Sequence, residues 1–399
     1  AASAALLPAL LGADGPRRYL VLLQNLAEVR ATGGMPGAYV VLRTDRGIVE
    51  IADQGTAAAD LRTFDAPVLP LRDADEALWT DKLGRFPANV NLTPDFPTAA
   101  ALAREMYRRR TGQAVDGVLA TDPVALGHLL SAIGPVPVPG GTTLTAGNAA
   151  AVLLSRTYAQ RDAPDDQDRY FAAAAKAVFQ AVMRRPLEPT AVLDALATAA
   201  GERRLLVWSA RPAENRPIAG TVLAGTLPAS DGTDPTVGVF LNDGSGAKLV
   251  YYLTRAAAVA VGPRCRRDGR REVTLTVTLG STAPASGLPA YVLGLGLSGD
   301  PYTVRTNVSV YSPTGGAIAG MRLRGRPTGF KSGQDRRRAV GITTVDLPPG
   351  SRATLEVTML TGVPAGGYGG RVTPRLRTTP GIGPWEQSVR SADGCTSTR

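Results

Sequence analysis

The chain has 399 residues, of which 44% are hydrophobic and 20% are charged. This length and composition exclude a disordered chain and predict two domains, each with its own apolar core. One histidine, His128, and two cysteines exclude His-rich and Cys-rich metal sites. The net charge of +10 comes almost entirely from arginine, a side chain suited to phosphate and carboxylate, although high-GC coding bias explains the same usage. The aromatic content of 5% disfavours a nucleic-acid partner.

Strand and helix patterns alternate over residues 1–217, which predicts a layered α/β domain. The apolar run 18–25 predicts a buried strand, and the glycine-rich segment 27–37 predicts a turn after it. Asp45-Arg46-Gly47 predicts a hairpin between the next two strands. Later elements are expected as helices over 95–112, 122–134, 144–160, 165–185 and 188–200, with strands over 115–121 and 202–210.

Helical periodicity disappears over residues 218–399, where alternating apolar runs are separated by turns such as Asn242-Asp243-Gly244. This spacing predicts an all-β antiparallel sandwich of immunoglobulin-like type. Both cysteines, Cys265 and Cys395, lie in this second domain. If the protein is extracellular we expect them to form a disulfide, with two free thiols as the alternative.

The chain opens on a short apolar stretch, residues 1–12, that looks like the tail of a longer helix. No apolar run is long enough to span a bilayer. We therefore expect an anchor upstream of this stretch and a protein that is secreted or held on the outer face of the membrane.

The densest group of polar residues and glycines follows the first strand. Here the carboxylate–arginine pair Glu28 and Arg30 lies beside the glycine-rich turn, and such turns at strand ends can hold an anion. The alternative is a sharp turn with a surface ion pair. Asn89 and Asn91 are expected on an extended segment before Asp95, and both Asp95 and Asp122 are alternatively simple helix caps.

A third group surrounds the loop between two later helices. Arg156 and Arg169 flank this loop and could clamp a diphosphate, while Asp165, Asp166 and Asp168 could hold a cation. Solvated loop charges are the alternative. His128 lies in an apolar helix, where a structural role is expected. The arginine runs 264–271 and 336–338 fall on turns of the second domain, with an anionic envelope polymer as one conceivable partner.

Several motifs in order resemble a bacterial envelope family known as domain of unknown function 4012. They are RRYLVLLQNLAEVRATGGMPGAY, NLTPDFPTAAALAREMY, VDGVLATDPVALGHLLSAIGPV and LTAGNAAAVLLSRTY, followed by VGVFLNDGSGAKLVYYL. A more distant resemblance is to the LytR-CpsA-Psr phosphotransferases, which transfer glycopolymers from a polyprenyl diphosphate carrier with magnesium, arginines and aspartates. The chain departs from their Arg-Ser-Asp-Thr-like strand and Pro-Arg-Asp turn, reading ATGGMPGAY and ADQGTA instead.

This resemblance implies a LytR-CpsA-Psr-like α/β domain and an extracytoplasmic glycopolymer phosphotransferase, with magnesium as its cofactor and the metal ligands unknown. The alternatives are a glycoside hydrolase that cleaves an envelope arabinan or galactan with paired carboxylates, and a non-catalytic surface module that binds glycan or protein. The catalytic candidates are Glu28, Asp45, Asp95 and Asp122. The substrate-binding candidates are Asn25, Arg30, Arg43, Asn89, Asn91, Arg156, Tyr158 and Arg169.

Overall fold

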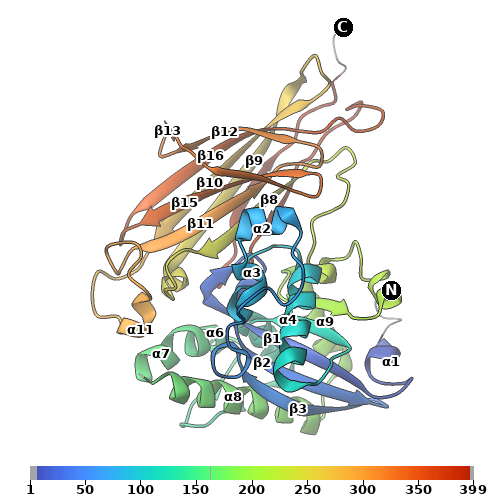
Figure 1. Ribbon diagram of the computed structural model, residues 1–399, viewed down its shortest axis with the longest axis vertical. Coiled ribbons are helices and arrows are strands. Elements are labelled where there is room, and N and C mark those ends of the chain that lie inside the picture. Colours follow the sequence, from blue (N-terminus) through green and yellow to red (C-terminus); the bar gives the residue numbers. More distant parts are fainter. Residues whose placement is uncertain (1–6, 162, 396–399) are drawn as a thin grey trace. The chain divides into compact units, whose positions relative to one another are not determined.

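The computed structural model describes residues 7–161 and 163–395, which divide into two compact units (Figure 1). The first unit runs to Leu71 and resumes over Asp81–Thr226. The second unit comprises Arg72–Thr80 and the chain from Leu227 onward. The second unit is therefore discontinuous in sequence. The expected division, with one boundary between residues 217 and 218, did not assign Arg72–Thr80 to the second unit.

A mixed five-stranded sheet organises the first unit, with strand order β3-β2-β1-β4-β7. β1 and β4 are parallel, and the other neighbouring strands are antiparallel. The strands are β1 (Arg17–Arg30), β2 (Gly33–Asp45), β3 (Ile48–Thr56), β4 (Gly117–Thr121) and β7 (Leu206–Ser209).

Helices pack against this sheet and connect its strands. α4 (Phe96–Thr111) packs on β4 and β7, α5 (Pro123–Ile133) packs on β1, and α8 (Pro164–Arg184) packs on β3. The shorter helical segments are α1 (Leu7–Leu10), η2 (Ala57–Leu61), α3 (Lys82–Arg85), η3 (Pro87–Asn89), α6 (Ala149–Ala151), η4 (Val152–Arg156), α7 (Thr157–Gln160), α10 (Pro212–Asn215) and η5 (Val222–Ala224). The longer helix α9 (Pro189–Gly201) packs on α5, and β5 (Val136–Pro137) pairs with β6 (Thr143–Leu144).

Two features of the region before α4 differ from the sequence prediction. The turn predicted within segment 27–37 lies at Ala31 and Thr32, but the glycines lie in β2, because β1 continues to Arg30 and Gly33 already begins β2. Asn89 ends the short helix η3 rather than lying on an extended segment. The Arg46-Gly47 hairpin is present as predicted, since both residues have the positive φ angles that a two-residue turn requires.

The second unit contains two sheets that are largely antiparallel. Their strand orders are β13-β12-β16-β10-β9-β18 and β14-β15-β11-β8-β17. The sheets face each other where β15 lies against β10, β12 and β16. The strands are β8 (Thr236–Asp243), β9 (Leu253–Cys265), β10 (Arg271–Ser281), β11 (Val304–Tyr311), β12 (Ala317–Leu323), β13 (Arg326–Pro327), β14 (Lys331–Asp335), β15 (Arg338–Leu347), β16 (Arg352–Leu360), β17 (Arg375–Thr378) and β18 (Glu386–Arg390).

Three short helices complete this unit. α2 (Asp73–Trp79) comes from the early part of the chain and packs on β14, while η6 (Leu249–Tyr252) and α11 (Ala290–Leu293) lie in connections between strands. The apolar run Leu249–Tyr252 forms η6 rather than a strand, and β9 begins at Leu253. The structure joins Cys265 to Cys395 in a disulfide, which is the predicted pairing.

Candidate functional site

A wide bulge in β1 shapes the region where the first polar group was predicted. Asn25 pairs with Met35 and Val29 pairs with Gly34, so residues 26–28 have no partner on β2. A Cβ atom on Gly34 would lie 2.2 Å from the backbone of Asn25, so only glycine permits this close crossing. The glycine therefore serves the bulge, and the bulge brings Glu28 into the protein interior.

Buried side chains form hydrogen bonds across this bulge. The Gly34 amide donates to Gln24 Oε1 at 3.0 Å, and the Thr32 hydroxyl reaches the same oxygen at 3.3 Å. Asn91 Nδ2 donates to Thr32 Oγ1 at 2.9 Å and to the Gly34 carbonyl at 2.8 Å. Asn91 thus ties the turn between β1 and β2 to the segment that follows η3.

The predicted pair Glu28 and Arg30 belongs to the same region, and both residues are buried. Arg30 Nη2 donates to Glu28 Oε1 at 2.9 Å and to Asn89 Oδ1 at 3.2 Å. Arg30 Nη1 donates to the Val29 carbonyl at 2.9 Å. This is a buried ion pair stabilised by further hydrogen bonds, in place of the surface pair that the sequence left open.

Two atoms of this region stand without a hydrogen-bond partner within the described residues, Arg30 Nε and Asn91 Oδ1. On the same bulge, Asn25 Nδ2 donates to the Tyr158 hydroxyl at 2.7 Å. Six predicted site residues therefore gather around one bulge, together with two that the sequence reasoning missed. We call them the bulge cluster: Gln24, Asn25, Glu28, Arg30, Thr32, Asn89, Asn91 and Tyr158.

The other predicted residues of the hairpin lie elsewhere. Arg43 and Asp45 occupy the far end of β2 and pair with each other at 2.9 Å. Asp45 lies eleven positions after Gly34 along β2, a span of about 35 Å. Of the catalytic candidates, Glu28 and Asp45 thus lie too far apart to act together as the paired carboxylates of a hydrolase, which are about 5–10 Å apart.

Asp95 and Asp122 are helix caps. This is the alternative to a catalytic role that the sequence left open for both residues. Asp95 Oδ2 accepts from the Thr98 amide at 3.3 Å and from its hydroxyl at 2.6 Å. Asp122 accepts from two backbone amides of α5 and forms a buried ion pair with Arg204 at 2.9 Å. Burial raises the pKa of Asp122, while Arg204 and the two amides oppose that shift.

His128 extends this pair toward the protein surface. Its Nε2 lies 3.2 Å from Glu202 Oε2, and Glu202 in turn pairs with Arg204. Although burial opposes the shift, hydrogen bonds from Arg204 and His128 lower the pKa of Glu202. The contact of His128 with Glu202 is consistent with the predicted structural role of His128.

The predicted diphosphate clamp is not assembled from converging arginines in the first unit. Arg156 ends η4 with an exposed side chain, and Arg169 is exposed and pairs with Asp166 on its own helix. The side chain of Asp165 lies outside the described residues. Over 7–161 and 163–395, no group of three or more His, Cys, Asp or Glu residues is placed to hold a metal ion.

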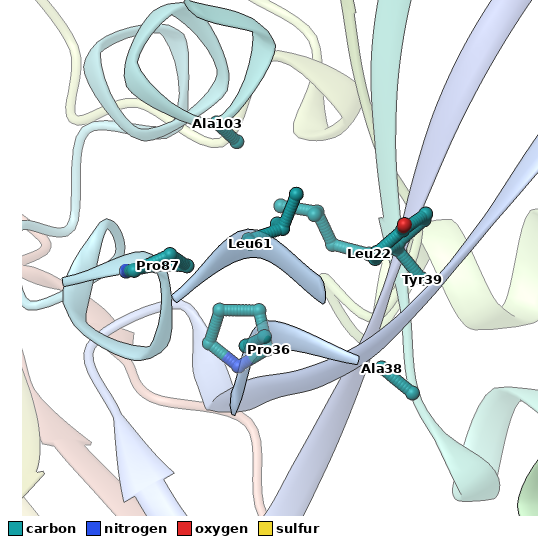
Figure 2. Close-up of a pocket in the computed structure, with 8 residues that line it drawn as sticks. Leu22, Pro36, Ala38, Tyr39, Leu61, Pro87 and Ala103 are labelled. Carbon is teal, nitrogen blue, oxygen red and sulfur yellow. The ribbon is translucent and has the colours of Figure 1, made fainter. Parts of the chain in front are cut away.

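A small apolar cavity lies between the sheet and α4, with a volume of about 10 Å³ (Figure 2). The Tyr39 ring packs edge-on against Tyr107, whose hydroxyl donates to Asp53 at 2.8 Å. Burial is the main cause that raises the pKa of Tyr107 to about 12 and also raises that of Tyr39. The cavity is lined by Leu22, Pro36, Ala38, Tyr39, Ala57, Leu61, Pro87 and Ala103, none of which the sequence indicated.

Comparison with known proteins supports the family resemblance for part of the chain. Residues 14–158 match the model of a family described as "Protein of unknown function (DUF4012)". The matched residues contain the whole bulge cluster. No curated protein matches. None of the described helices is both long enough and apolar enough to cross a membrane.

Solved structures show only distant similarity. A Bacillus subtilis transcriptional regulator is 10% identical, with 53% of this chain and 78% of that chain covered and a TM-score of 0.31. An Enterococcus faecalis transcriptional regulator is 11% identical, with 54% and 74% covered and a TM-score of 0.31. A Legionella pneumophila protein described as nutrient-binding is 8% identical, with 36% and 48% covered and a TM-score of 0.24. The chain thus spans about half of the last protein, and none of these scores supports an argument about function.

Proposed function

We propose that the chain is an extracytoplasmic protein that binds cell-envelope glycan without cleaving or transferring it. The observation that carries the proposal is that every candidate catalytic carboxylate either forms an ion pair or caps a helix. Glu28 is ion-paired inside the bulge, Asp95 and Asp122 cap helices, and Asp45 pairs with Arg43. A general acid or nucleophile needs an oxygen that can reach substrate, and these oxygens are held by the fold.

The disulfide supports the proposed location. Structural disulfides persist in oxidising compartments outside the cytoplasm, and Cys265–Cys395 closes a loop that spans most of the second unit. For the folds we propose a LytR-CpsA-Psr-like first unit and an immunoglobulin-like second unit, on the resemblance and on the two facing sheets. Glycan as the ligand rests on the family resemblance.

Glycopolymer transfer is the second candidate, favoured by the Nε of the buried Arg30, which has no hydrogen-bond partner among the residues that the structure describes. A guanidinium with an unused donor could bind a diphosphate oxygen if the bulge cluster opened. Magnesium does not fit the cluster as the structure has it, because Glu28 is its one carboxylate and is already bound to Arg30. We therefore derive no step through a metal.

The test is incubation of the purified chain with envelope glycans, both arabinan or galactan and teichoic-type polymers. Binding is measured by co-sedimentation, and soluble products are measured by mass spectrometry, with magnesium and with EDTA. We expect retained glycan of unchanged length in both conditions. Oligosaccharide release lost in Glu28→Gln but kept in Glu50→Gln, an exposed control, would instead establish a hydrolase.

A separate reaction tests transfer. The chain is given a polyprenyl-diphosphate-linked glycan and an acceptor glycan, and we expect no new linkage. Turnover that disappears in Arg30→Ala and persists in Arg46→Ala would overturn the binding proposal in favour of the transferase.

A further inference from the structure

The hairpin that joins β9 to β10 carries an unusual density of arginine. Arg264, Arg266 and Arg267 are exposed, and Arg270 is about two-fifths exposed. Asp268 is the single acid of residues 264–271, and it lies 3.9–4.0 Å from its two arginine neighbours. Ion pairs of this length at an exposed turn neutralise little charge.

A second arginine turn lies at the same end of the two sheets. Arg336 and Arg337 are exposed at the turn between β14 and β15. On either side of them, Asp335 is bound to Arg72 and Arg338 is bound to Asp231. The second turn therefore adds two exposed positive charges.

Contacts through two short loops connect the turns. The Gly315 amide donates to the Arg337 carbonyl at 2.6 Å, and Gly315 packs against Gly362. The next residue, Val363, lies beside Gly269 at the tip of the first turn. We call the six exposed or half-exposed side chains of the two turns the arginine end: Arg264, Arg266, Arg267, Arg270, Arg336 and Arg337.

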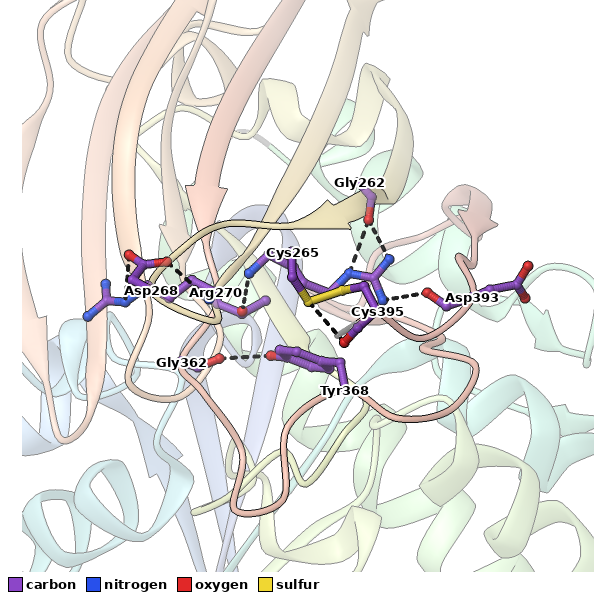
Figure 3. The surroundings of a disulfide bond; sticks show 10 residues. Gly262, Cys265, Asp268, Arg270, Gly362, Tyr368, Asp393 and Cys395 are labelled. Carbon is purple, nitrogen blue, oxygen red and sulfur yellow. Dashed lines mark hydrogen bonds and ion pairs between the residues drawn. A yellow bond between two sulfur atoms is a disulfide. The ribbon is translucent and has the colours of Figure 1, made fainter. Parts of the chain in front are cut away.

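The base of the first turn is held rigid (Figure 3). Cys265 is bonded to Cys395, and the fully buried Arg271 donates to the carbonyls of Gly262 and Asp393. Its guanidinium also lies 5.7 Å from the Tyr368 ring. A turn whose base is already rigid loses little backbone entropy on binding, which favours a binding role over a flexible solvated loop.

We propose that the arginine end binds a phosphodiester-linked envelope glycopolymer. This inference rests on the proposed function and names its surface and the chemistry of its ligand. Guanidinium groups match phosphate oxygens, and two connected turns suit an extended anion rather than a single ion. Nucleic acid is disfavoured because the arginine end has no aromatic side chain for base stacking and lies beside a disulfide.

The test measures binding of a poly(glycerol phosphate) of teichoic type to the full chain by fluorescence anisotropy. The variants are Arg266→Gln/Arg267→Gln and Arg336→Gln/Arg337→Gln. The control is Arg46→Gln/Arg184→Gln, which removes the same charge from exposed positions of the first unit. At about 50 mM salt we expect each test pair to weaken binding about fivefold and the control less than twofold, with a shallower salt dependence in the test pairs.

Equal weakening by the control pair would overturn the inference, because it would show a response to net charge alone. Equally tight binding of double-stranded DNA or of anionic vesicles would overturn the assignment to a glycopolymer. Binding of neutral arabinan or galactan that no arginine variant changes would overturn the inference while leaving the proposed function standing. Unchanged melting temperatures in the variants would show that each effect arises in the bound state.

Discussion

Gly34 shows how a single residue sets the geometry of the candidate site. Its lack of a Cβ atom lets β2 pass beside the bulged backbone of β1, and its amide and carbonyl bind Gln24 and Asn91. Gly37 lies in the same strand, and a Cβ there would meet only the flexible end of Met35. The two glycines look alike in sequence but differ in what surrounds them.

Gly34→Ala is expected to lower the free energy of unfolding by about 2–3 kcal/mol, because the new methyl group would overlap the backbone of Asn25. Gly37→Ala is the matched control and should change it by less than about 1 kcal/mol. Urea denaturation followed by circular dichroism measures both. Similar losses in the two variants would contradict the close crossing at Gly34.

At the scale of elements, helix α4 follows the rules for helix ends closely. Asp95 caps its start, a proline follows in the first turn, and Gly112 ends it in a left-handed conformation. Its last turn carries Arg108, Arg109 and Arg110, and these positive charges stabilise the helix by interacting with the negative end of its dipole. Glu105 pairs with Arg108 and Arg109, both at 2.8 Å.

These arginines lower the pKa of Glu105 from 4.5 to about 2, chiefly through hydrogen bonding from Arg108. A carboxyl pKa that is lowered by folding stabilises the protein above its unfolded value, and this contribution is lost as the pH falls. We expect Glu105→Gln to cost about 1 kcal/mol at pH 7, since both arginines are half-exposed. The difference between wild type and variant should shrink as pH drops from about 4.5 to about 2 in thermal melts, whereas a constant difference would contradict the pairing.

At the scale of the whole molecule, the second unit depends on a segment from early in the chain. Within that unit, α2 packs on β14, where Lys331 Nζ donates to the Leu78 carbonyl at 3.0 Å. Leu78 is buried, and Arg72 bonds both Asp75 and Asp335. The nine residues of Arg72–Thr80 therefore belong structurally to a unit that otherwise begins after residue 226.

Leu78→Ala is expected to cost about 2–4 kcal/mol, because it removes a buried side chain and leaves a cavity. Leu193→Ala, at a leucine that is 55% exposed, is the control and should cost less than about 1 kcal/mol. Differential scanning calorimetry measures both. An unaffected melt in Leu78→Ala would argue against the docking of α2 on the second unit.

The disulfide acts on the same unit. Reduction, or the paired change Cys265→Ser/Cys395→Ser, should lower its stability by about 3–5 kcal/mol, since the bond closes a loop with a sequence separation of 130. Thermal melts with and without reductant measure the loss. The serine variant is the control for the reductant, because its melt should not respond to the reagent.

Local signals in the sequence were sufficient for many elements. The cap residues Asp95 and Asp122 and the closing Gly112 and Gly134 placed α4 and α5, since a helix end requires particular side chains or positive φ angles. The turn residues Asp45-Arg46-Gly47 likewise predicted the hairpin, because its tight turn requires positive φ angles. The bulge in β1 was not predicted, because the need for Gly34 arises from another strand crossing it.

The sequence by itself determined the order of the elements, the change from mixed α/β to β structure, and a first candidate group at Glu28 and Arg30. Only the structure brought Asn89, Asn91 and Tyr158 to that group. Periodicity, caps and turn residues are properties of neighbours along the chain, so they can be read directly. Only the tertiary structure decided that Glu28 is buried in an ion pair and that Asp45 lies a strand length away from Glu28. It also decided that Arg72–Thr80 belongs to the second unit. Those outcomes depend on which distant residues meet, and contact between distant residues is set by packing.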